Sequence, residues 1–149
     1  MTQTTKGLAI CYWNASGITG KMHDFPAFVD EHIPDLLLLL QETKLKNNKG
    51  IYLPNYLLYR NDGPQNPASG GTAIFIKNSI SHKEIFIPNF SAISATILTI
   101  NLINQPPITI ASVYVPCRFD ARFINDLNFI LNNNSSVILC GDFNAHHRL

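Results

Sequence analysis

The sequence is poor in charged residues, which make up 14% of its 149 residues, against roughly 25% in an average soluble domain. Its formal net charge is +1, so bulk charge does not indicate a nucleic-acid partner, and any basic surface must be local. Hydrophobic residues account for 46% of the chain, which is enough to bury a core. The charge deficit therefore predicts many interior strands, or a surface that something else covers.

Long hydrophobic runs are also missing. The longest strongly apolar stretch is 36–40, and a membrane-spanning helix needs about 20 residues, so we expect no membrane partner. The N-terminal segment MTQTTKG is short and polar, unlike a signal peptide, and we expect 1–7 to be a disordered leader. The three cysteines are odd in number and fit neither a disulfide nor a metal framework. They indicate a reducing, intracellular setting.

The first forty residues predict a strand, a helix and a second strand. Residues 8–13 (LAICYW) and 36–40 (LLLLL) are short apolar runs typical of buried strands. Between them, residues 21–32 place apolar side chains at helical spacing. This order is a βαβ unit, so the two strands should be parallel neighbours.

Short β-rich runs separated by turn residues dominate the rest of the chain. They lie at 56–60, 72–77, 84–87, 95–102 and 108–115, a spacing that favours an antiparallel meander. A second helix is predicted at 119–131, with Asp120 as a possible cap, and a last buried strand at 137–140. The fold class is therefore α/β with mixed sheets.

Acid and amide residues stand where three of the apolar strands end. Asn14 follows the first strand, Glu42 the second, and Asp142 and Asn144 the last. If these strands are neighbours, the side chains converge on one rim, where open α/β sheets bind ligands. Oxygen ligands of this kind suit Mg²⁺ or Mn²⁺. Taken singly, each residue could equally be a solvated or turn residue.

Several motifs, in order along the chain, resemble those of the endonuclease/exonuclease/phosphatase superfamily. They are WNASG (13–17), LLLQET (38–43), SGGTAI (69–74), SVYVP (112–116) and GDFNAHH (141–147). The phrases IPDLLLLLQET, LPNYLLYRND and GGTAIFIKNSI look like the N-terminal endonuclease of jockey-type non-LTR retrotransposons. The resemblance runs from about residue 8 to residue 147. It implies an incomplete four-layer αββα sandwich, in which helices flank two mixed, mostly antiparallel sheets.

The resemblance also implies a role for each site residue. Glu42 would be the main metal-binding carboxylate, with Asn14 beside it, contacting the metal or holding Asp142. Tyr114 would place its hydroxyl against the scissile phosphate, although a lone strand tyrosine is more often a packing residue. Asp142 would orient or activate the attacking water. Asn144 would hydrogen-bond the phosphate, and the cofactor would be Mg²⁺ or Mn²⁺.

The lysine-rich stretch after the second strand has two interpretations. Lys44, Lys46 and Lys49 lie within six residues and Arg60 follows, which is typical of a solvated loop. The alternative is that Lys44 and Arg60 contact nucleic acid.

Two features depart from the family pattern. Ser16 stands where the family often has Asp or Asn. Serine offers a hydroxyl there, not a carboxylate. The sequence ends at Leu149, before the late Ser-Asp-His-like motif of the family, and His146 and His147 look like supporting or exposed residues. We therefore expect 8–149 to be the N-terminal part of such a domain, lacking its last strands.

Three functional hypotheses follow. The first is a Mg²⁺-dependent endonuclease that nicks DNA so that a reverse transcriptase can prime from it, with a downstream reverse transcriptase domain in the same polyprotein. Such a protein would be intracellular, and nuclear when it acts on DNA. The second is a catalytically inactive fragment that binds metal or nucleic acid weakly at most. The third keeps the superfamily but changes the substrate to a phosphoinositide or RNA.

Overall fold

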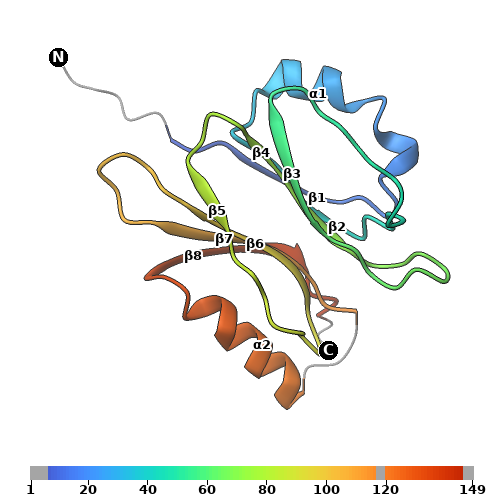
Figure 1. The fold of residues 1–149 in the computed structure, drawn as a ribbon, viewed down its shortest axis with the longest axis vertical. Helices are drawn as coiled ribbons and strands as arrows, with labels where there is room; N and C mark the ends of the chain where they lie inside the picture. Colours follow the sequence, from blue (N-terminus) through green and yellow to red (C-terminus); the bar gives the residue numbers. More distant parts are fainter. Residues whose placement is uncertain (1–6, 117–119, 146–149) are drawn as a thin grey trace.

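Two four-stranded sheets lie face to face, and each carries one helix on its outer face (Figure 1). The computed structural model describes residues 7–116 and 120–145, and for 36–39 it describes the backbone alone. The first sheet has the order β1 (Ile10–Asn14), β2 (Leu36–Gln41), β4 (Thr72–Lys77), β3 (Tyr56–Asn61). The second has the order β5 (His82–Glu84), β6 (Ser94–Ile100), β7 (Ile108–Tyr114), β8 (Ser136–Asp142). The helices are α1 (Phe25–His32) and α2 (Ala121–Leu131), with a short 3₁₀ turn, η1 (Thr19–Lys21), before α1.

Each sheet contains one parallel pair joined through a helix. β1 and β2 are parallel, with Asn14 opposite Gln41, which confirms the predicted βαβ unit. β7 and β8 are also parallel, with Tyr114 opposite Asp142, and α2 lies between them in the chain. Because parallel strands end at the same edge of a sheet, each pair brings its last residues together.

The predicted antiparallel meander is divided between the two sheets. β3 and β4 complete the first sheet, and only β5, β6 and β7 form a meander in the second. The strand predicted at 84–87 pairs earlier, at His82–Glu84, and afterwards only the Ile85 N–H reaches β6, at the Ile97 carbonyl.

The helices follow their local signals. α1 begins at Phe25, later than the predicted residue 21, because Pro26 fits only the first turn of a helix. Ile33 ends α1 with φ 42°. In α2 the predicted cap is confirmed, since the Asp120 side chain accepts hydrogen bonds from the N–H groups of Arg122 and Phe123. The hydrogen-bonded Arg122 side chain lowers the pKa of Asp120. In the part of the chain that the structure describes, no helix is long and apolar enough to span a membrane.

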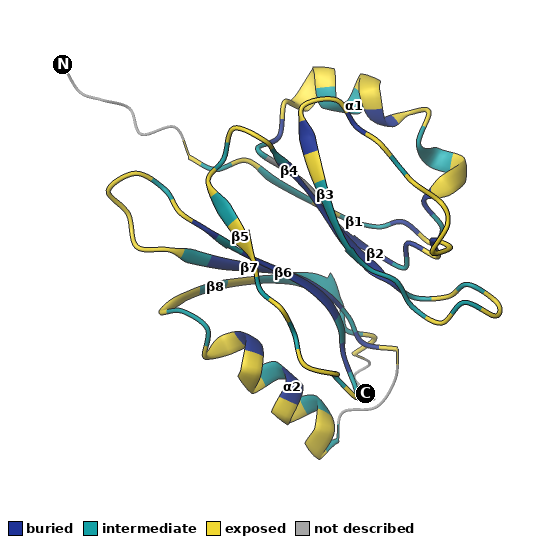
Figure 2. Ribbon diagram, viewed as in Figure 1, coloured by how far each residue is buried: buried dark blue, intermediate teal, exposed yellow. Residues whose placement is uncertain are grey.

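Three apolar layers hold the sheets and helices together, and Figure 2 shows the buried residues along the packed strands. The central layer between the sheets contains Ile74, Ile76, Leu98, Ile100 and Ile110. The layer around α1 includes Phe25, Leu40, Leu45 and Phe75, and the layer around α2 includes Ile97, Val113, Val115 and Ile130. Full burial of one such side chain stabilises the fold by about 1.5–3 kcal/mol. The α/β sandwich is therefore a four-layer αββα arrangement.

One buried carboxylate fastens α2 to the loop before β6. Asp126 Oδ2 accepts hydrogen bonds from the backbone N–H groups of Ser91, Ala92 and Ile93, at 3.0, 2.8 and 3.1 Å. The residue is only 8% exposed. Without this carboxylate, three donors on a non-helical turn would lose their acceptor.

We predict that Asp126→Ala lowers the free energy of unfolding by about 2–4 kcal/mol, because buried N–H groups left without an acceptor carry their full desolvation cost. Urea denaturation of the wild-type and variant chains measures the change. Asn125→Ala, at the exposed neighbouring position, should change stability by less than about 0.5 kcal/mol. Equal effects of the two substitutions would contradict this role of Asp126.

Candidate active site

The three predicted strand ends meet around the side chain of Asn14, the last residue of β1. Its Nδ2 donates to Glu42 Oε1 at 2.9 Å and to Asp142 Oδ2 at 2.8 Å. Glu42 directly follows β2 in the first sheet, whereas Asp142 ends β8 in the second. The expected rim is therefore formed across the two sheets, and β8 is not a hydrogen-bonded neighbour of β1 or β2.

Asn14 uses its whole amide in this arrangement. Both donors go to carboxylates, and Oδ1 accepts from the Ser16 N–H at 3.2 Å. A neutral group between two like charges lowers their repulsion and fixes one oxygen of each. Of the two roles considered for Asn14, the structure shows the one in which it holds Asp142, and it holds Glu42 as well.

A row of polar side chains crosses the first sheet and ends at Asn14 of the site. Neighbouring register positions on the four strands are occupied by Asn61, Thr72, Gln41 and Asn14, which we call the polar row. Each member bonds to the second sheet: Asn61 to the Ala95 carbonyl, Thr72 to Thr96, Gln41 to Ser112, and Asn14 to Asp142. Gln41, Thr72, Thr96 and Ser112 are buried, so these bonds are shielded from water.

The polar row fixes how the two sheets meet. Its bonds have matched partners only in one alignment, whereas the apolar layer beside it could slide. Glu42 follows Gln41 directly, and Gln41 donates to Ser112 Oγ at 3.0 Å while that hydroxyl donates to the Leu40 carbonyl at 2.7 Å. The end of β2 is thereby anchored to β7 one residue before the candidate metal ligand.

The loop that carries Glu42 has an unusual backbone. Glu42 and Lys44 have φ values of 48° and 50°, in the left-handed region. Two backbone hydrogen bonds hold this loop. The Gly17 N–H donates to the Glu42 carbonyl at 2.8 Å, and the Lys44 N–H donates to the Gly70 carbonyl at 2.9 Å. Non-glycine residues persist in this region where surrounding contacts over-determine them, commonly at functional sites.

Gly70 and Gly71, from the SGGTAI motif, pack against residues of the site. A Cβ on Gly71 would lie 2.5 Å from Thr43 Oγ1, and one on Gly70 would lie 3.4 Å from a ring carbon of Tyr114. Both glycines have a positive φ, 58° at Gly70 and 85° at Gly71. The pair lets the backbone pass close to Thr43 and Tyr114. Two glycines directly before the apolar strand 72–76 were the sequence signal for such a close approach.

Tyr114 and Asn144 both lie next to Asp142, and their contact with a phosphate stays a prediction. Tyr114 is the register partner of Asp142 at the end of the second sheet. The Asn144 N–H donates to Asp142 Oδ1 at 2.9 Å, and its Nδ2 donates to the Val115 carbonyl at 2.9 Å. Asp142 is thus held at both oxygens, and Asn144 ties the segment after β8 to the segment after β7.

The two predicted nucleic-acid contacts are in different surroundings. Lys44 Nζ lies 3.5 Å from Glu42 Oε2 and donates to Ser16 Oγ at 3.3 Å, so it is part of the site. The Arg60 guanidinium bonds Asp62 and the carbonyls of Lys46 and Lys49, which shapes the loop after Glu42. Contact of either residue with nucleic acid stays a prediction.

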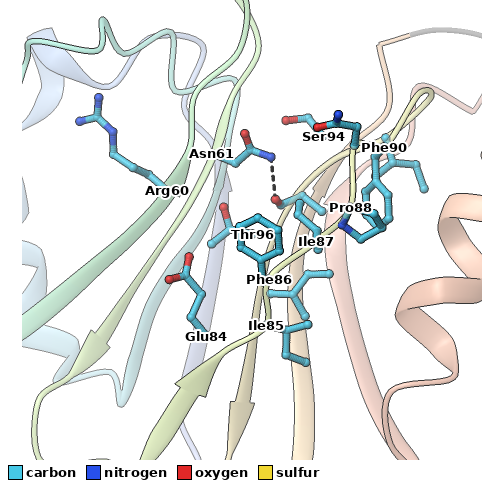
Figure 3. Close-up of a pocket in the computed structure, with 14 residues that line it drawn as sticks. Arg60, Asn61, Glu84, Ile85, Phe86, Ile87, Pro88, Phe90, Ser94 and Thr96 are labelled. Carbon is cyan, nitrogen blue, oxygen red and sulfur yellow. Dashed lines mark hydrogen bonds between the residues drawn. The ribbon is translucent and has the colours of Figure 1, made fainter.

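A pocket of about 580 Å³ lies away from the carboxylates, between β3 and the segment around β5 and β6 (Figure 3). Its lining includes Asn61, Glu84, Phe86 and Thr96. In Figure 3 the Arg60 guanidinium points away from this group of side chains. The pocket contains neither Glu42 nor Asp142, so the candidate site is an open rim and not this cavity.

The donor set fits a hard divalent cation better than zinc. Glu42 is 23% exposed at its side chain and offers carboxylate oxygens, with the Asp142 carboxylate on the other side of Asn14. Within residues 7–116 and 120–145, no three His, Cys, Asp or Glu side chains form a ligand group. Burial raises the pKa of the nearby Cys140 thiol, so this cysteine favours its protonated form and not the thiolate that binds zinc.

The histidines that the structure describes lie in other surroundings. His23 pairs with Asp24, His32 packs on Phe28 beside Glu31, and His82 bonds Tyr59. His146 and His147, expected to be supporting or exposed, lie outside the described residues. The described part of the site therefore consists of carboxylates, amides, a tyrosine and a lysine.

Comparison with known proteins agrees with this geometry. The sequence matches the endonuclease/exonuclease/phosphatase family over residues 11–149. The chain belongs to this family. Divalent metal use is general among its nucleases. Glu42 and Asp142, joined by Asn14, lie inside the matched region.

Two curated relatives are mobile-element proteins of Drosophila melanogaster. One is the RNA-directed DNA polymerase from mobile element jockey, 31% identical over 149 residues, and the other the probable RNA-directed DNA polymerase from transposon X-element, 34% identical over 147 residues. They align with 99% and 95% of this chain, which spans only 16% of the length of each. This chain is therefore similar to a short part of two RNA-directed DNA polymerases of mobile elements.

Two solved structures share the fold. The AP endonuclease LMAP from Leishmania major superposes with a TM-score of 0.65 at 20% identity, over 91% of this chain and 54% of that one. The endonuclease domain of TRAS1, a telomere-specific non-LTR retrotransposon, gives a TM-score of 0.67 at 11% identity, over 95% of this chain and 61% of that one. The expected αββα sandwich is confirmed by both.

We predict a coupling energy of about 1.5–3 kcal/mol between Asn14 and Asp142, because a hydrogen bond to a charged group is worth about this much. Urea unfolding of Asn14→Ala, Asp142→Ala and the double variant measures it. A matched control cycle combines Asn14→Ala with Glu84→Ala. Glu84 lies on β5, at the opposite edge of the second sheet from β8. The coupling energy of this control pair should stay within about 0.5 kcal/mol. Additive effects of Asn14→Ala and Asp142→Ala would contradict the bridge.

Proposed function

We propose that this chain carries the metal-binding and water-orienting side of a DNA-nicking phosphodiesterase site, used by a retrotransposon to prime reverse transcription at its target. One observation supports this most: Asn14 joins Glu42 and Asp142 across the two sheets at 2.9 and 2.8 Å. Such an arrangement keeps two carboxylates at one rim although their charges repel, which a purely structural role would not require.

Each side chain has a defined task in this proposal. Glu42 would hold the divalent ion, Mg²⁺ or Mn²⁺, which would supply positive charge to neutralise the charge that develops on the phosphate. Asp142, fixed at both oxygens by Asn14 and the Asn144 N–H, orients the attacking water. Tyr114, beside Asp142, contacts a non-bridging phosphate oxygen. Preorganised donors and acceptors of this kind lower the barrier because they need no reorientation during the reaction.

DNA is the substrate class that the relatives favour over RNA or a phosphoinositide. The similar chains come from RNA-directed DNA polymerases of mobile elements, and the TRAS1 domain is an endonuclease of a retrotransposon. A reverse transcriptase domain in the same polyprotein is accordingly the proposed partner. A protein that nicks chromosomal DNA would act in the nucleus.

A second candidate function is metal or nucleic-acid binding without turnover. It is favoured by the surroundings of the described histidines, because His23, His32 and His82 all bond or pack on groups other than Asn14, Glu42 and Asp142. A general acid or base contributes roughly 10²–10⁴-fold to such reactions. A site without such a group would bind its ligand with little turnover.

We predict Mg²⁺-dependent nicking of supercoiled plasmid, measured as conversion to the relaxed circle. Glu42→Gln and Asp142→Asn should reduce the rate to the protein-free background, because each removes a charge that the site needs. Glu84→Gln, an exposed carboxylate on β5, is the matched control and should keep the wild-type rate.

Two results would decide against the enzymatic proposal. Nicking that continues unchanged in Glu42→Gln would show that another group, or a contaminating nuclease, is responsible. Absence of nicking by the wild-type chain, with Mn²⁺ binding that is still lost in Glu42→Gln, would select the binding function.

A further inference from the structure

The ammonium group of Lys44 stands at the carboxylate proposed to hold the metal. Lys44 Nζ lies 3.5 Å from Glu42 Oε2, the oxygen that Asn14 leaves free, since Asn14 donates to Oε1. The two side chains are 39% and 23% exposed, so the pair is partly shielded from water. A cation therefore already occupies the open side of Glu42.

The backbone keeps Lys44 at this place. Lys44 has a left-handed φ of 50°, and its N–H donates to the Gly70 carbonyl at 2.9 Å. The Glu42 carbonyl is fixed by the Gly17 N–H at 2.8 Å. Because both ends of this short loop are fixed, the lysine side chain starts close to the carboxylate and needs little ordering to reach it.

Lys44 contacts two residues at this place, Ser16 and Glu42, and of these two only Glu42 carries a charge. The Ser16 hydroxyl accepts a hydrogen bond from Nζ at 3.3 Å, but it carries no charge and cannot neutralise the ammonium. Among the residues that the structure describes, Glu42 is the carboxylate in an ion pair with Lys44. Electrostatic attraction therefore directs the lysine toward the metal ligand.

We propose that Lys44 is an internal competitor for the divalent cation, which occupies Glu42 until the ion displaces it. This inference rests on the metal site of the proposed function. When no ion is bound, the ammonium offsets the negative charge that Glu42 and Asp142 bring to one rim. Binding of the ion breaks the ion pair and releases the ammonium to the edge of the site, so the apparent metal affinity is set by both groups.

The proposal predicts that Lys44→Met tightens Mn²⁺ binding about tenfold, because a positive charge close to the ion and its competition for Oε2 are both removed. Electron paramagnetic resonance of free Mn²⁺, titrated with the 149-residue chain at low ionic strength, measures the dissociation constant. The gain should shrink at high salt, which screens the interaction of exposed charges.

Two variants separate this effect from a change in overall charge. Lys46→Met removes the same charge from an exposed neighbour and should leave Mn²⁺ affinity within about twofold of wild type. Lys44→Arg keeps the positive charge and should retain most of the competition. Unchanged or weaker Mn²⁺ binding in Lys44→Met would overturn the inference, and so would an equal gain in Lys46→Met.

Glu42→Gln distinguishes failure of this inference from failure of the proposed function. If Glu42→Gln abolishes Mn²⁺ binding and Lys44→Met binds like wild type, the metal site stands and only the competition is wrong. If Glu42→Gln binds Mn²⁺ as well as wild type does, the metal site itself is wrong, and the proposed function fails with it.

Discussion

The site depends on one neutral amide that joins two carboxylates from different sheets. Asn14 ends β1, and its Nδ2 bonds both Glu42 and Asp142. Two carboxylates at one rim repel each other, and a shared donor pair is a direct way to hold both in place without neutralising either. This geometry exists only when the two sheets are packed in the right alignment, so folding and assembly of the site are a single event.

The polar row explains how that alignment is set. Asn61, Thr72, Gln41 and Asn14 occupy matched positions on all four strands of the first sheet, and each bonds to the second. Apolar layers tolerate rearrangement as long as volume is kept, whereas buried hydrogen bonds require specific partners. The row is thus a positional reference for the sandwich, and its last member is the residue that builds the site.

Much of the fold could be predicted from the sequence, because short apolar runs bounded by turn residues mark strands in any context. Strands, both helices and the positions of Glu42 and Asp142 at strand ends were predictable in this way. The division of the strands between two sheets was not, since periodicity shows which residues are buried and not which strands pair. The predicted meander of 56–115 failed at this point.

The remaining site residues depend on contacts between distant segments. Gly70 and Gly71 matter because Thr43 and Tyr114 approach them from other strands, and Lys44 matters because its ammonium group lies beside Glu42. Asn14 looked like a metal ligand or a support for Asp142, and only the structure shows that it bonds both carboxylates. The family resemblance could suggest that Asn14 holds Asp142, but the contact of Asn14 with Glu42 and the placement of Lys44 could not be read from the sequence.

The central claim is that Glu42 and Asp142 share one rim that binds a divalent ion. Crystals of the chain soaked in Mn²⁺ and measured at the manganese absorption edge test it most directly. The account predicts an anomalous peak about 2.0–2.2 Å from Glu42 Oε2, the carboxylate oxygen that Asn14 does not bond. A peak at another site alone, or Glu42 and Asp142 on separate surfaces, would contradict it.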